Sequence, residues 1–527
     1  MAKRAPRARQ DEPADRPAPR QSATLPWLLY AVVFVCGAVL MSLEMIGSRM
    51  LAPYFGNSIF VWGSLISVFL AALSLGYWLG GMVADRWPRF SVLAMLIAAP
   101  GVIIAILPFV YPALNRAIAG GDIGSRMGPL LSSIMLFLVP SVFLGTISPF
   151  AVRLQARAVA SVGTTAGGLY AVSTAGSILG TLVTTFYLIA VAGVANIVHG
   201  LGIVLLAVSA SILLGRQRVR QAGIVGLCAV VLLTVMIWHA RTRAAEAGLI
   251  LQKDSFYNHI RLAEDGEQRY MDFENLRQSA MSLKDPWDLR LRYTRFLPLA
   301  LTLQPEPKRA LILGLGGGSF PKRLYRDFPD VVVDAVDIDP EVIDIAKRYF
   351  EVPEDARSRL FATDGRQFVK QATDKYDLIF LDAYNSDTIP FHLATREFYE
   401  EVRRRLAPGG VVVSNIIGTL RGPQSAFFRS MYRTMSQVFP TVYVVPTYDQ
   451  SRGWILGDIN IILLATQDPT RLSRGDLVAR AGRVGGRLIP ASELAEYAAF
   501  LSEVPVETGD VPILTDDFAP VEILRAL

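Results

Sequence analysis

The sequence predicts an α-helical membrane bundle of about seven spans, followed by a small β hairpin unit and an α/β doubly wound domain. Three observations predict this fold class. Long uncharged runs fill residues 26–240 of the 527-residue chain, which is 52% hydrophobic, too apolar for one soluble domain. From residue 309 onward, strand and helix patterns alternate, which is typical of a parallel sheet. A glycine-rich turn at 314–318 separates a predicted strand from a helix.

The composition divides the chain into four parts. Residues 1–25 are rich in Arg, Pro and Ala, and we expect a disordered basic tail there because an apolar core is missing. The run that follows is too long for the apolar region of a cleavable signal peptide. We expect the membrane domain at 26–240, the β hairpin and linking helix of an enzyme domain at 251–305, and the α/β domain at 306–527.

A membrane-spanning helix needs about 20 apolar residues. The candidate spans are roughly 26–48, 58–82, 91–114, 129–151, 165–191, 193–214 and 222–240. Small residues in these runs favour close helix packing, namely Gly76, Gly80, Gly81, Gly176 and Gly180. The sequence therefore predicts a multi-pass protein of the cell (inner) membrane, with the lipid bilayer as one partner.

The loop charges orient this bundle. Arginines are more numerous on the side of the N-terminal tail than on the opposite side, which predicts a cytoplasmic N-terminus. Seven spans then place the enzyme domain outside, whereas nucleotide-derived cofactors are usually cytoplasmic. The two inferences conflict, and the sequence leaves the side of the enzyme domain open.

Other features exclude several classes of site. Much of the positive excess behind the net charge of +6 lies in the N-terminal tail and the short loops, and no interleaving of basic and aromatic residues indicates a nucleic-acid partner. Cys36 and Cys228 lie in apolar runs, so neither a disulfide framework nor a cysteine metal site is expected. Glu44 and Arg49 flank the end of the first span, where we favour an interfacial anchor over a transport site.

Short strands are expected at 256–262 and 268–274, joined by a turn at 264–267, and a helix at 287–303. The α/β pattern then predicts strands at 309–314, 331–337, 358–362, 376–382 and 409–415, alternating with helices at 320–328, 340–350, 365–372 and 394–406. A hairpin at 441–446 and 459–465 is expected to close the sheet.

The glycine-rich turn points to a nucleoside. Its glycines, Gly314, Gly316, Gly317 and Gly318, let a ligand approach the backbone and the free N–H groups of the next helix. An acidic pair, Asp337 and Asp339, follows about 20 residues later at the end of the next strand, where a carboxylate binds ribose hydroxyls. We favour Asp337 for the ribose, and the other carboxylate for capping the next helix.

Two further aspartates follow later strands of the predicted sheet. Asp364, before Gly365, either reads an adenine amino group or caps a helix. Asp382 ends the strand Tyr-Asp-Leu-Ile-Phe-Leu-Asp, at the edge where parallel sheets bind ligands. A carboxylate there removes a proton from an attacking amine or holds a cation, so Asp382 is the catalytic candidate. Asp387 lies nearby on the following loop.

These residues resemble the polyamine aminopropyltransferases, the spermidine synthases, over about 254–415. The resemblance rests on the hairpin, the glycine turn, Val-Asp-Ile-Asp, Asp-Gly and the Asp382 strand. Three further segments resemble the multi-spanning, membrane-fused branch of that family: Leu-Ala-Pro-Tyr-Phe-Gly at 51–56, Gly-Tyr-Trp-Leu-Gly-Gly at 76–81 and Leu-Thr-Asp-Asp-Phe-Ala-Pro-Val-Glu at 514–522. The resemblance implies a Rossmann-like, methyltransferase-type fold. It also implies aminopropyl transfer from decarboxylated S-adenosylmethionine to putrescine, without a metal, and by analogy it allows a homodimer.

The resemblance also implies residue roles. Asp337 would hold the ribose, Asp364 the adenine, and Asp382 would deprotonate the acceptor amine. Asn258 and Gln278 would contact the nucleoside donor through their amides. Tyr293 matches the tyrosine that opens the family's Tyr-His-Glu stretch.

Departures from the family pattern open alternatives. The Tyr-His-Glu stretch here reads Tyr293-Thr294-Arg295, and Asn385 replaces an aspartate for which Asp387 is the nearest substitute. Arg295 would repel a cationic aminopropyl tail and suit a carboxylate. The hypothesis is therefore that the pocket takes intact S-adenosylmethionine, for methyl transfer or chemistry at its methionine end. A transporter or sensor gated by a nucleoside-binding domain is a third reading, and a dehydrogenase ranks below it.

Overall fold

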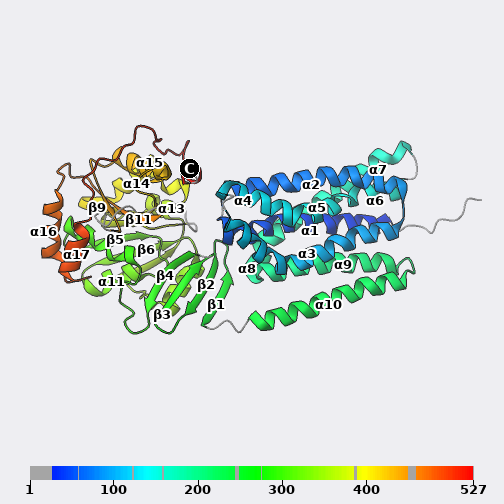
Figure 1. Ribbon diagram of the computed structural model, residues 1–527, viewed down its shortest axis with the longest axis horizontal. Helices are drawn as coiled ribbons and strands as arrows, with labels where there is room; N and C mark the ends of the chain where they lie inside the picture. Colours follow the sequence, from blue (N-terminus) through cyan, green and yellow to red (C-terminus); the bar gives the residue numbers. More distant parts are fainter. Residues whose placement is uncertain are drawn as a thin grey trace, which may run out of the picture.

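A computed structural model describes residues 26–56, 58–121, 124–156, 159–243, 248–274, 276–384, 389–448 and 458–525. The molecule is elongated, with a bundle of long helices at one end and a sheet-rich half at the other (Figure 1). The last helix of the bundle ends at Arg243, and the first strand begins at Leu249.

The bundle consists of long helices with two π-helical segments. Its elements are α1 (Pro26–Phe55), α2 (Ile59–Arg86), α3 (Phe90–Ala119), α4 (Gly124–Ser133), η1 (Ile134–Leu138), α5 (Val139–Gly145), α6 (Ile147–Gln155), η2 (Val159–Ser161), α7 (Val162–Val183), η3 (Thr184–Leu188), α8 (Ile189–Val191), α9 (Val194–Leu214) and α10 (Val219–Arg243). Among the described residues, six helices are long and apolar enough to cross a membrane. The seventh expected run lies in α10, whose apolar stretch Val219–Val235 is shorter, so the count of seven stays a prediction.

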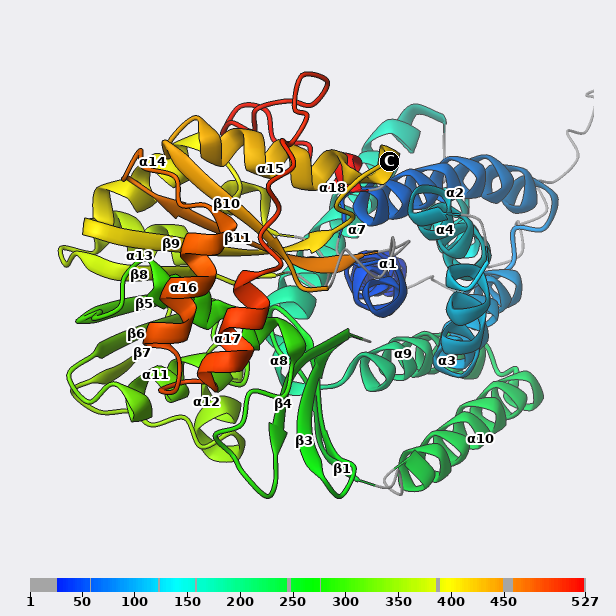
Figure 2. The same ribbon diagram turned by 60° about the vertical axis from the view of Figure 1, so that its left-hand side comes forward.

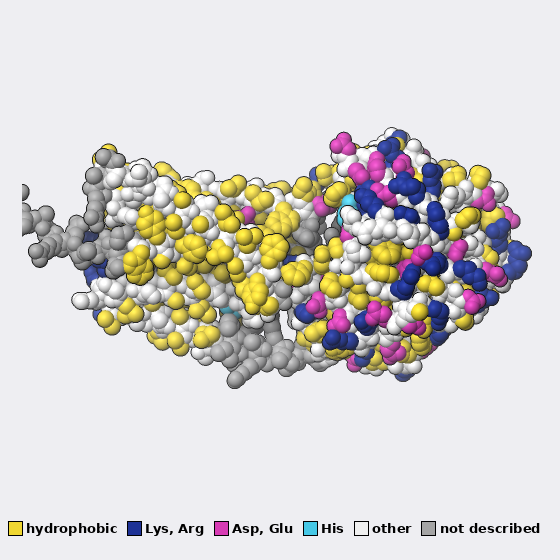
Figure 3. Space-filling view, turned by 180° about the vertical axis from the view of Figure 1, so that it is seen from behind, with side chains coloured by type: hydrophobic (Ala, Val, Ile, Leu, Met, Phe, Trp, Pro, Cys, Tyr) yellow, Lys and Arg dark blue, Asp and Glu magenta, His cyan; other side chains and the backbone are white. Residues whose placement is uncertain are grey.

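The outer surface of the bundle is apolar. Figure 3 shows hydrophobic side chains over the bundle, whereas charged side chains gather over the sheet-rich half. Leu70, Trp78 and Phe186, for example, are more than half exposed. Exposed apolar area on this scale is typical of a surface that contacts lipid.

Glycines bring the helices of the bundle into close contact. A Cβ atom on Gly176 would lie 2.0 Å from the Phe34 carbonyl oxygen, and one on Gly180 would lie 2.3 Å from the Ala38 carbonyl oxygen. Gly76 and Gly80 likewise leave no room for a Cβ atom against the α5–α6 segment. The packing role is therefore confirmed for four of the five glycines, and it is wrong for Gly81, which has nothing within 4 Å.

A four-stranded antiparallel sheet follows the bundle. Its strands, in the spatial order β1-β2-β3-β4, are β1 (Leu249–Asp254), β2 (His259–Glu264), β3 (Gln268–Phe273) and β4 (Leu276–Ser282). The expected hairpin corresponds to β2 and β3, and Gly266 has the positive φ of +89° that suits its turn. The two outer strands, β1 and β4, were not expected from the sequence. They extend the hairpin to four strands, and an isolated two-stranded hairpin is marginally stable at best.

The expected helix at 287–303 is wrong. The structure has two short 3-10 helices there, η4 (Arg292–Arg295) and η5 (Leu297–Thr302). Pro298 lacks the N–H for an α-helical hydrogen bond and disfavours the α conformation at Leu297 before it. The segment is buried throughout Leu297–Thr302, which explains its apolar pattern.

The larger sheet has seven strands in the order β10-β11-β9-β8-β5-β6-β7, of which β5 to β9 are parallel. They are β5 (Arg309–Leu313), β6 (Val332–Asp337), β7 (Ser358–Ala362), β8 (Tyr376–Leu381), β9 (Leu406–Gly418), β10 (Thr441–Pro446) and β11 (Ile459–Thr466). β11 pairs antiparallel with both β9 and β10. The predicted strands, the closing hairpin and the doubly wound order are confirmed, since strands are added from β5 to β7 on one side of β5 and then from β8 to β9 on its other side.

Helices cover both faces of this sheet (Figure 2). One face packs on α11 (Ser319–Asp327), α12 (Pro340–Tyr349), α16 (Arg474–Val484) and α17 (Ala491–Ala498), and the other on α13 (Gly365–Gln371), α14 (Arg396–Arg405) and α15 (Ala426–Ser436). The remaining elements are η6 (Phe391–Leu393), η7 (Pro423–Ser425) and α18 (Val521–Arg525). The smaller sheet belongs to the first of these cores, so the hairpin unit and the α/β domain share one hydrophobic core.

Candidate active site

A cavity of about 350 Å³ lies at the carboxyl ends of β5, β6 and β8, where the strand order reverses. This is where open α/β sheets bind ligands. Its wall brings together most of the residues expected from the sequence: Asn258, Gln278, Tyr293, Gly314, Gly316, Gly318, Asp337, Asp364, Gly365 and Asp382.

The glycine turn forms one wall of the cavity. Gly314, Gly316 and Gly318 have φ values of +96°, +52° and +62°, which side chains rarely adopt. A Cβ atom on Gly314 would lie 2.2 Å from the Asp382 carbonyl oxygen, so glycine there lets β5 and β8 approach each other. Gly317 differs from its neighbours, because it packs under the turn and donates its N–H to Ser279 Oγ at 2.7 Å.

The acidic pair at the end of β6 has two roles, because Asp337 lines the cavity and Asp339 caps a helix. Asp337 faces the cavity and accepts the N–H of Leu315 at 3.0 Å and the N–H of Asp339 at 3.0 Å. Burial raises the pKa of Asp337 to about 6, against the lowering effect of these hydrogen bonds. Asp339 is fully buried and accepts the N–H of Glu341, so it caps α12 as expected.

Asp364 both lines the cavity and caps a helix. Its Oδ1 accepts the N–H of Gln367 at 2.9 Å, and its Oδ2 lies 2.9 Å from Nε2 of His392. Asp364 can therefore act both as a helix cap and as a ligand-binding residue. One oxygen caps α13, while the other lies beside His392 at the cavity.

Asp382 directly follows β8, and both oxygens of its carboxylate accept hydrogen bonds from other side chains. Its Oδ1 accepts an N–H of the Asn415 side chain at 2.8 Å, and its Oδ2 accepts the Tyr293 hydroxyl at 2.9 Å. Burial raises the pKa of the Asp382 carboxyl to about 6, while both hydrogen bonds oppose the rise. A carboxylate with this pKa is ionised at neutral pH and accepts a proton more readily than an ordinary aspartate.

The small sheet and its linker close the cavity from the opposite side. Asn258, the last residue of the turn between β1 and β2, donates from Nδ2 to Asp339 Oδ2 at 3.1 Å. Gln278 of β4 and Tyr293 of η4 complete this wall. The hairpin unit therefore supplies side chains to the same cavity as the α/β domain.

The structure corrects the position expected for Arg295. Its side chain does not line the cavity, because successive residues of η4 point in different directions. It forms a two-bonded fork with Glu493 of α17, with Nη2 to Oε2 at 2.6 Å, and it also reaches Asp288 at 3.3 Å. The expectation that Arg295 contacts the tail of the donor is therefore wrong. The expected contact of Asp387, like Asn385, lies outside the described residues.

Three polar residues of the site were missed. Asn415 lies in β9 and holds Asp382, and Tyr384 donates to the Asn415 carbonyl oxygen at 2.7 Å. His392 of η6 faces Asp364. The signal for Asn415 was present, since Ser414-Asn415 follows an apolar run in a predicted parallel strand, as Asp382 does.

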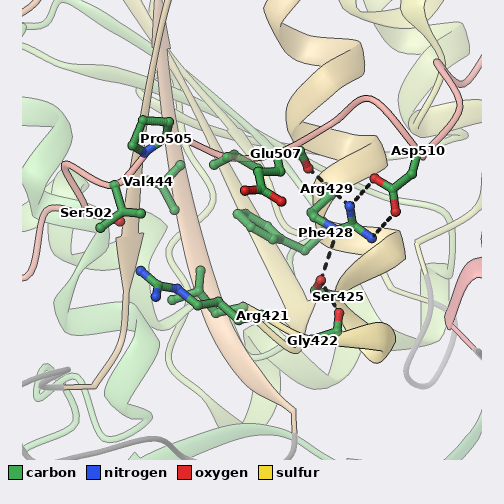
Figure 4. A pocket seen from close by; sticks show the side chains of 13 residues that line it. Arg421, Gly422, Ser425, Phe428, Arg429, Val444, Ser502, Pro505, Glu507 and Asp510 are labelled. Atoms are coloured by element: carbon green, nitrogen blue, oxygen red, sulfur yellow. Dashed lines mark hydrogen bonds and ion pairs between the residues drawn. The ribbon is translucent and has the colours of Figure 1, made fainter.

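A second cavity, of about 510 Å³, lies between α15 and the C-terminal segment. Figure 4 shows Arg429 pairing with Asp510 beside it, at 2.9 Å from Nη2 to Oδ2. None of the site residues expected from the sequence lines this cavity. The candidate active site is therefore the cavity at the strand ends.

Comparison with known proteins agrees with this geometry. The spermine/spermidine synthase domain family matches residues 293–457. A polyamine aminopropyltransferase of Vibrio vulnificus (strain CMCP6) is 32% identical over 291 residues, which is 53% of this chain and 92% of that protein. One of Chromobacterium violaceum is 37% identical over 159 residues, covering 30% of this chain and 60% of the relative.

Solved structures show a weaker likeness. Spermidine synthase from Thermotoga maritima has a TM-score of 0.38 and 21% identity, and covers 49% of this chain and 85% of its own. A spermidine synthase in complex with the transition-state analogue AdoDATO has a TM-score of 0.40 and 21% identity. The match covers 49% of this chain and 86% of that protein. The Vibrio relative, aligned over nearly its whole length, decides the assignment: the chain belongs to the polyamine aminopropyltransferase (spermidine synthase) family of enzymes.

Proposed function

We propose that the chain is a membrane-anchored enzyme that transfers the aminopropyl group of decarboxylated S-adenosylmethionine to putrescine or a related amine. The products are spermidine and methylthioadenosine. The observation that carries the proposal is Asp382, a carboxylate with a pKa raised to about 6 that lies at a strand end beside a glycine turn. Family membership supports the reaction class, and this geometry supports the assignment of the base.

The reaction needs one proton transfer and one displacement. The acceptor's ammonium gives a proton to Asp382, which makes the nitrogen nucleophilic. The nitrogen then attacks the aminopropyl carbon bound to the sulfonium sulfur. A C–N bond forms as the C–S bond breaks, and the bonding electron pair leaves with sulfur as the neutral thioether of methylthioadenosine. Tyr293 and Asn415 orient the carboxylate during this step.

The nucleoside end of the donor is assigned to the glycine turn and the strand ends. Asp337 accepts the ribose hydroxyls, because its two oxygens have about four lone-pair sites and backbone N–H groups occupy only some of them. Asp364 and Gly365 take the adenine, and Asn258 and Gln278 contact the donor from the small sheet. Gly314, Gly316 and Gly318 line its path, while Gly317 shapes the turn from below.

The position of Arg295 bears on the choice of donor. The alternative of intact S-adenosylmethionine rested on Arg295 meeting its carboxylate, and the guanidinium instead pairs with Glu493. Decarboxylated S-adenosylmethionine is therefore the donor that we propose. Asp387 remains a candidate for binding the far ammonium of the acceptor, since it follows Asp382 by five residues in the sequence.

The apolar helices support membrane anchoring. Six of them are long enough to span a bilayer, and their outer surface is apolar. We assign 26–240 to the membrane domain, 251–305 to the small sheet with its linker, and 306–527 to the Rossmann-like domain.

Product analysis by mass spectrometry tests the proposal. Purified full-length protein receives putrescine with either decarboxylated or intact S-adenosylmethionine. We expect spermidine and methylthioadenosine from the decarboxylated donor only, and a rate about 10²–10⁴-fold lower for Asp382→Asn. Asp377→Asn is the matched control, because Asp377 lies on the same strand and caps backbone N–H groups at its other end. Equal rates for Asp382→Asn and Asp377→Asn would refute the assignment of the base.

A further inference from the structure

The turn between β1 and β2, residues Asp254–Asn258, is held by two helices of the bundle. Arg49, near the end of α1, donates from its guanidinium to the Phe256 carbonyl oxygen. Asp254 Oδ2 accepts the N–H of Val194 at 3.3 Å, at the first residue of α9. The positive end of the α9 dipole stabilises the Asp254 carboxylate. Together with the hydrogen bond from Arg49, this contact holds the turn in one position against the bundle.

The same turn is bonded to the donor site on its other side. Ser255 Oγ donates to Asp339 Oδ2 at 2.5 Å, and Asn258 Nδ2 donates to the same oxygen at 3.1 Å. The backbone N–H of Asp339 donates in turn to Oδ1 of Asp337 at 3.0 Å. A continuous series of hydrogen bonds therefore joins the turn to the carboxylate that we assign to the ribose.

The turn is also a thin wall between two cavities. Tyr257 and Asn258 line the active-site cavity, and they also line a cavity of about 220 Å³ between the small sheet and the bundle. Arg49 lies on the bundle side of that second cavity. Because only these two residues are shared, a displacement of the turn changes the wall of the donor site directly.

We propose that Arg49 is a positioning residue for the donor: α1 holds the Asp254–Asn258 turn in the conformation that completes the nucleoside site. This inference rests on the proposed function, because it assumes that the cavity binds a nucleoside donor. It makes the membrane half a part of the catalytic unit and more than an attachment. Arg49 acts through the turn and touches no reacting atom.

The test uses full-length protein in lipid nanodiscs and the substitution Arg49→Gln. A charge-assisted hydrogen bond is lost, so we expect the KM for decarboxylated S-adenosylmethionine and the Kd for methylthioadenosine to rise about tenfold. The kcat and the KM for putrescine should change less than about twofold. Arg49→Lys keeps a cationic donor and should restore part of the donor affinity. Arg153→Gln is the control, because Arg153 pairs with Asp85 in an exposed ion pair of α6 and α2.

A double-mutant cycle separates coupling from general damage. Ser255→Ala removes the bond from the turn to Asp339 and should raise the same two constants. If both residues act through one turn, the double variant loses less affinity than the product of the single losses. Multiplicative losses, or an unchanged donor KM in Arg49→Gln, would overturn the proposal. If Arg49→Gln fails to elute as a monodisperse protein, the cycle is run with Arg49→Lys.

Binding of methylthioadenosine, measured by calorimetry, needs no turnover. If the wild-type protein makes no spermidine, the proposed function fails, yet the ratio of Kd values still decides whether Arg49 positions the nucleoside site. The two failures are therefore distinguishable.

Discussion

At the residue scale, the carboxylates of Asp337 and Asp382 differ in how their oxygens are used. Asp337 is tied to backbone N–H groups of the glycine turn, which fixes it as a rigid acceptor. Asp382 is held by two side chains, Tyr293 and Asn415, and retains lone pairs toward the cavity. The first arrangement suits binding, and the second suits a group that gains and loses a proton.

The pKa of Asp382 predicts the pH dependence of catalysis. The base must be ionised, and its pKa is raised to about 6, so kcat should fall as the pH drops through about 6. Asn415→Ala removes a hydrogen bond that favours the ionised form, so this acid limb should move to higher pH by about one unit. The measurement is the kcat–pH profile of both proteins between pH 5 and 8 at saturating substrates. A limb that stays in place in Asn415→Ala would contradict the role given to this hydrogen bond.

Much of the site was predictable, because aspartates that directly follow parallel strands must meet at one edge of the sheet. Asp337, Asp364 and Asp382 were found in this way. Arg295 was misplaced because its partner, Glu493, lies about 200 residues later in a helix that no local pattern connects to it. Side-chain direction within a short 3-10 turn is likewise not encoded by sequence spacing.

At the element scale, the parallel strands were the easiest elements to predict. Each is a short apolar run bounded by turn residues, and burial on both faces removes any alternation. β1 and β4 were missed, because they carry polar residues such as Gln252 and Arg277 on their exposed faces. The link at 287–303 has an apolar pattern but forms short 3-10 helices instead of an α-helix. Its apolar side chains are buried by packing, which needs no α-helical conformation.

The contact between α1 and α7 gives a prediction about helix packing. Gly176→Ala places a Cβ atom 2.0 Å from the Phe34 carbonyl oxygen, so the two helices must separate. We expect a loss of about 1–3 kcal/mol in stability and a lower midpoint of thermal unfolding in detergent. Gly81→Ala is the matched control, because nothing lies within 4 Å of that position. Equal midpoints for the two variants would show that α1 and α7 do not pack in this way.

At the scale of the whole molecule, the enzyme half lies at the end of the bundle where α1 finishes. Arg49 contacts the turn after β1, and Ile59, at the start of α2, donates its N–H to Glu522 at 2.6 Å. Pro26 begins α1 at the other end, and the rise of an α-helix places it about 35 Å from Arg49 along the helix axis. This distance matches the thickness of a bilayer's hydrocarbon core, which is about 30 Å.

The two ends of the chain should therefore lie on opposite faces of the membrane. The shorter apolar stretch of α10 returns the chain to the enzyme end, and the arginine-rich loops lie at the Pro26 end, which favours a cytoplasmic N-terminus. The measurement is a pair of fusions in a bacterial host, one of green fluorescent protein at the N-terminus and one of alkaline phosphatase after the last residue. We expect fluorescence from the first and phosphatase activity from the second. The reciprocal pair should be silent. If both ends report the same face, α10 does not cross the membrane, and the enzyme domain shares the compartment of the N-terminus.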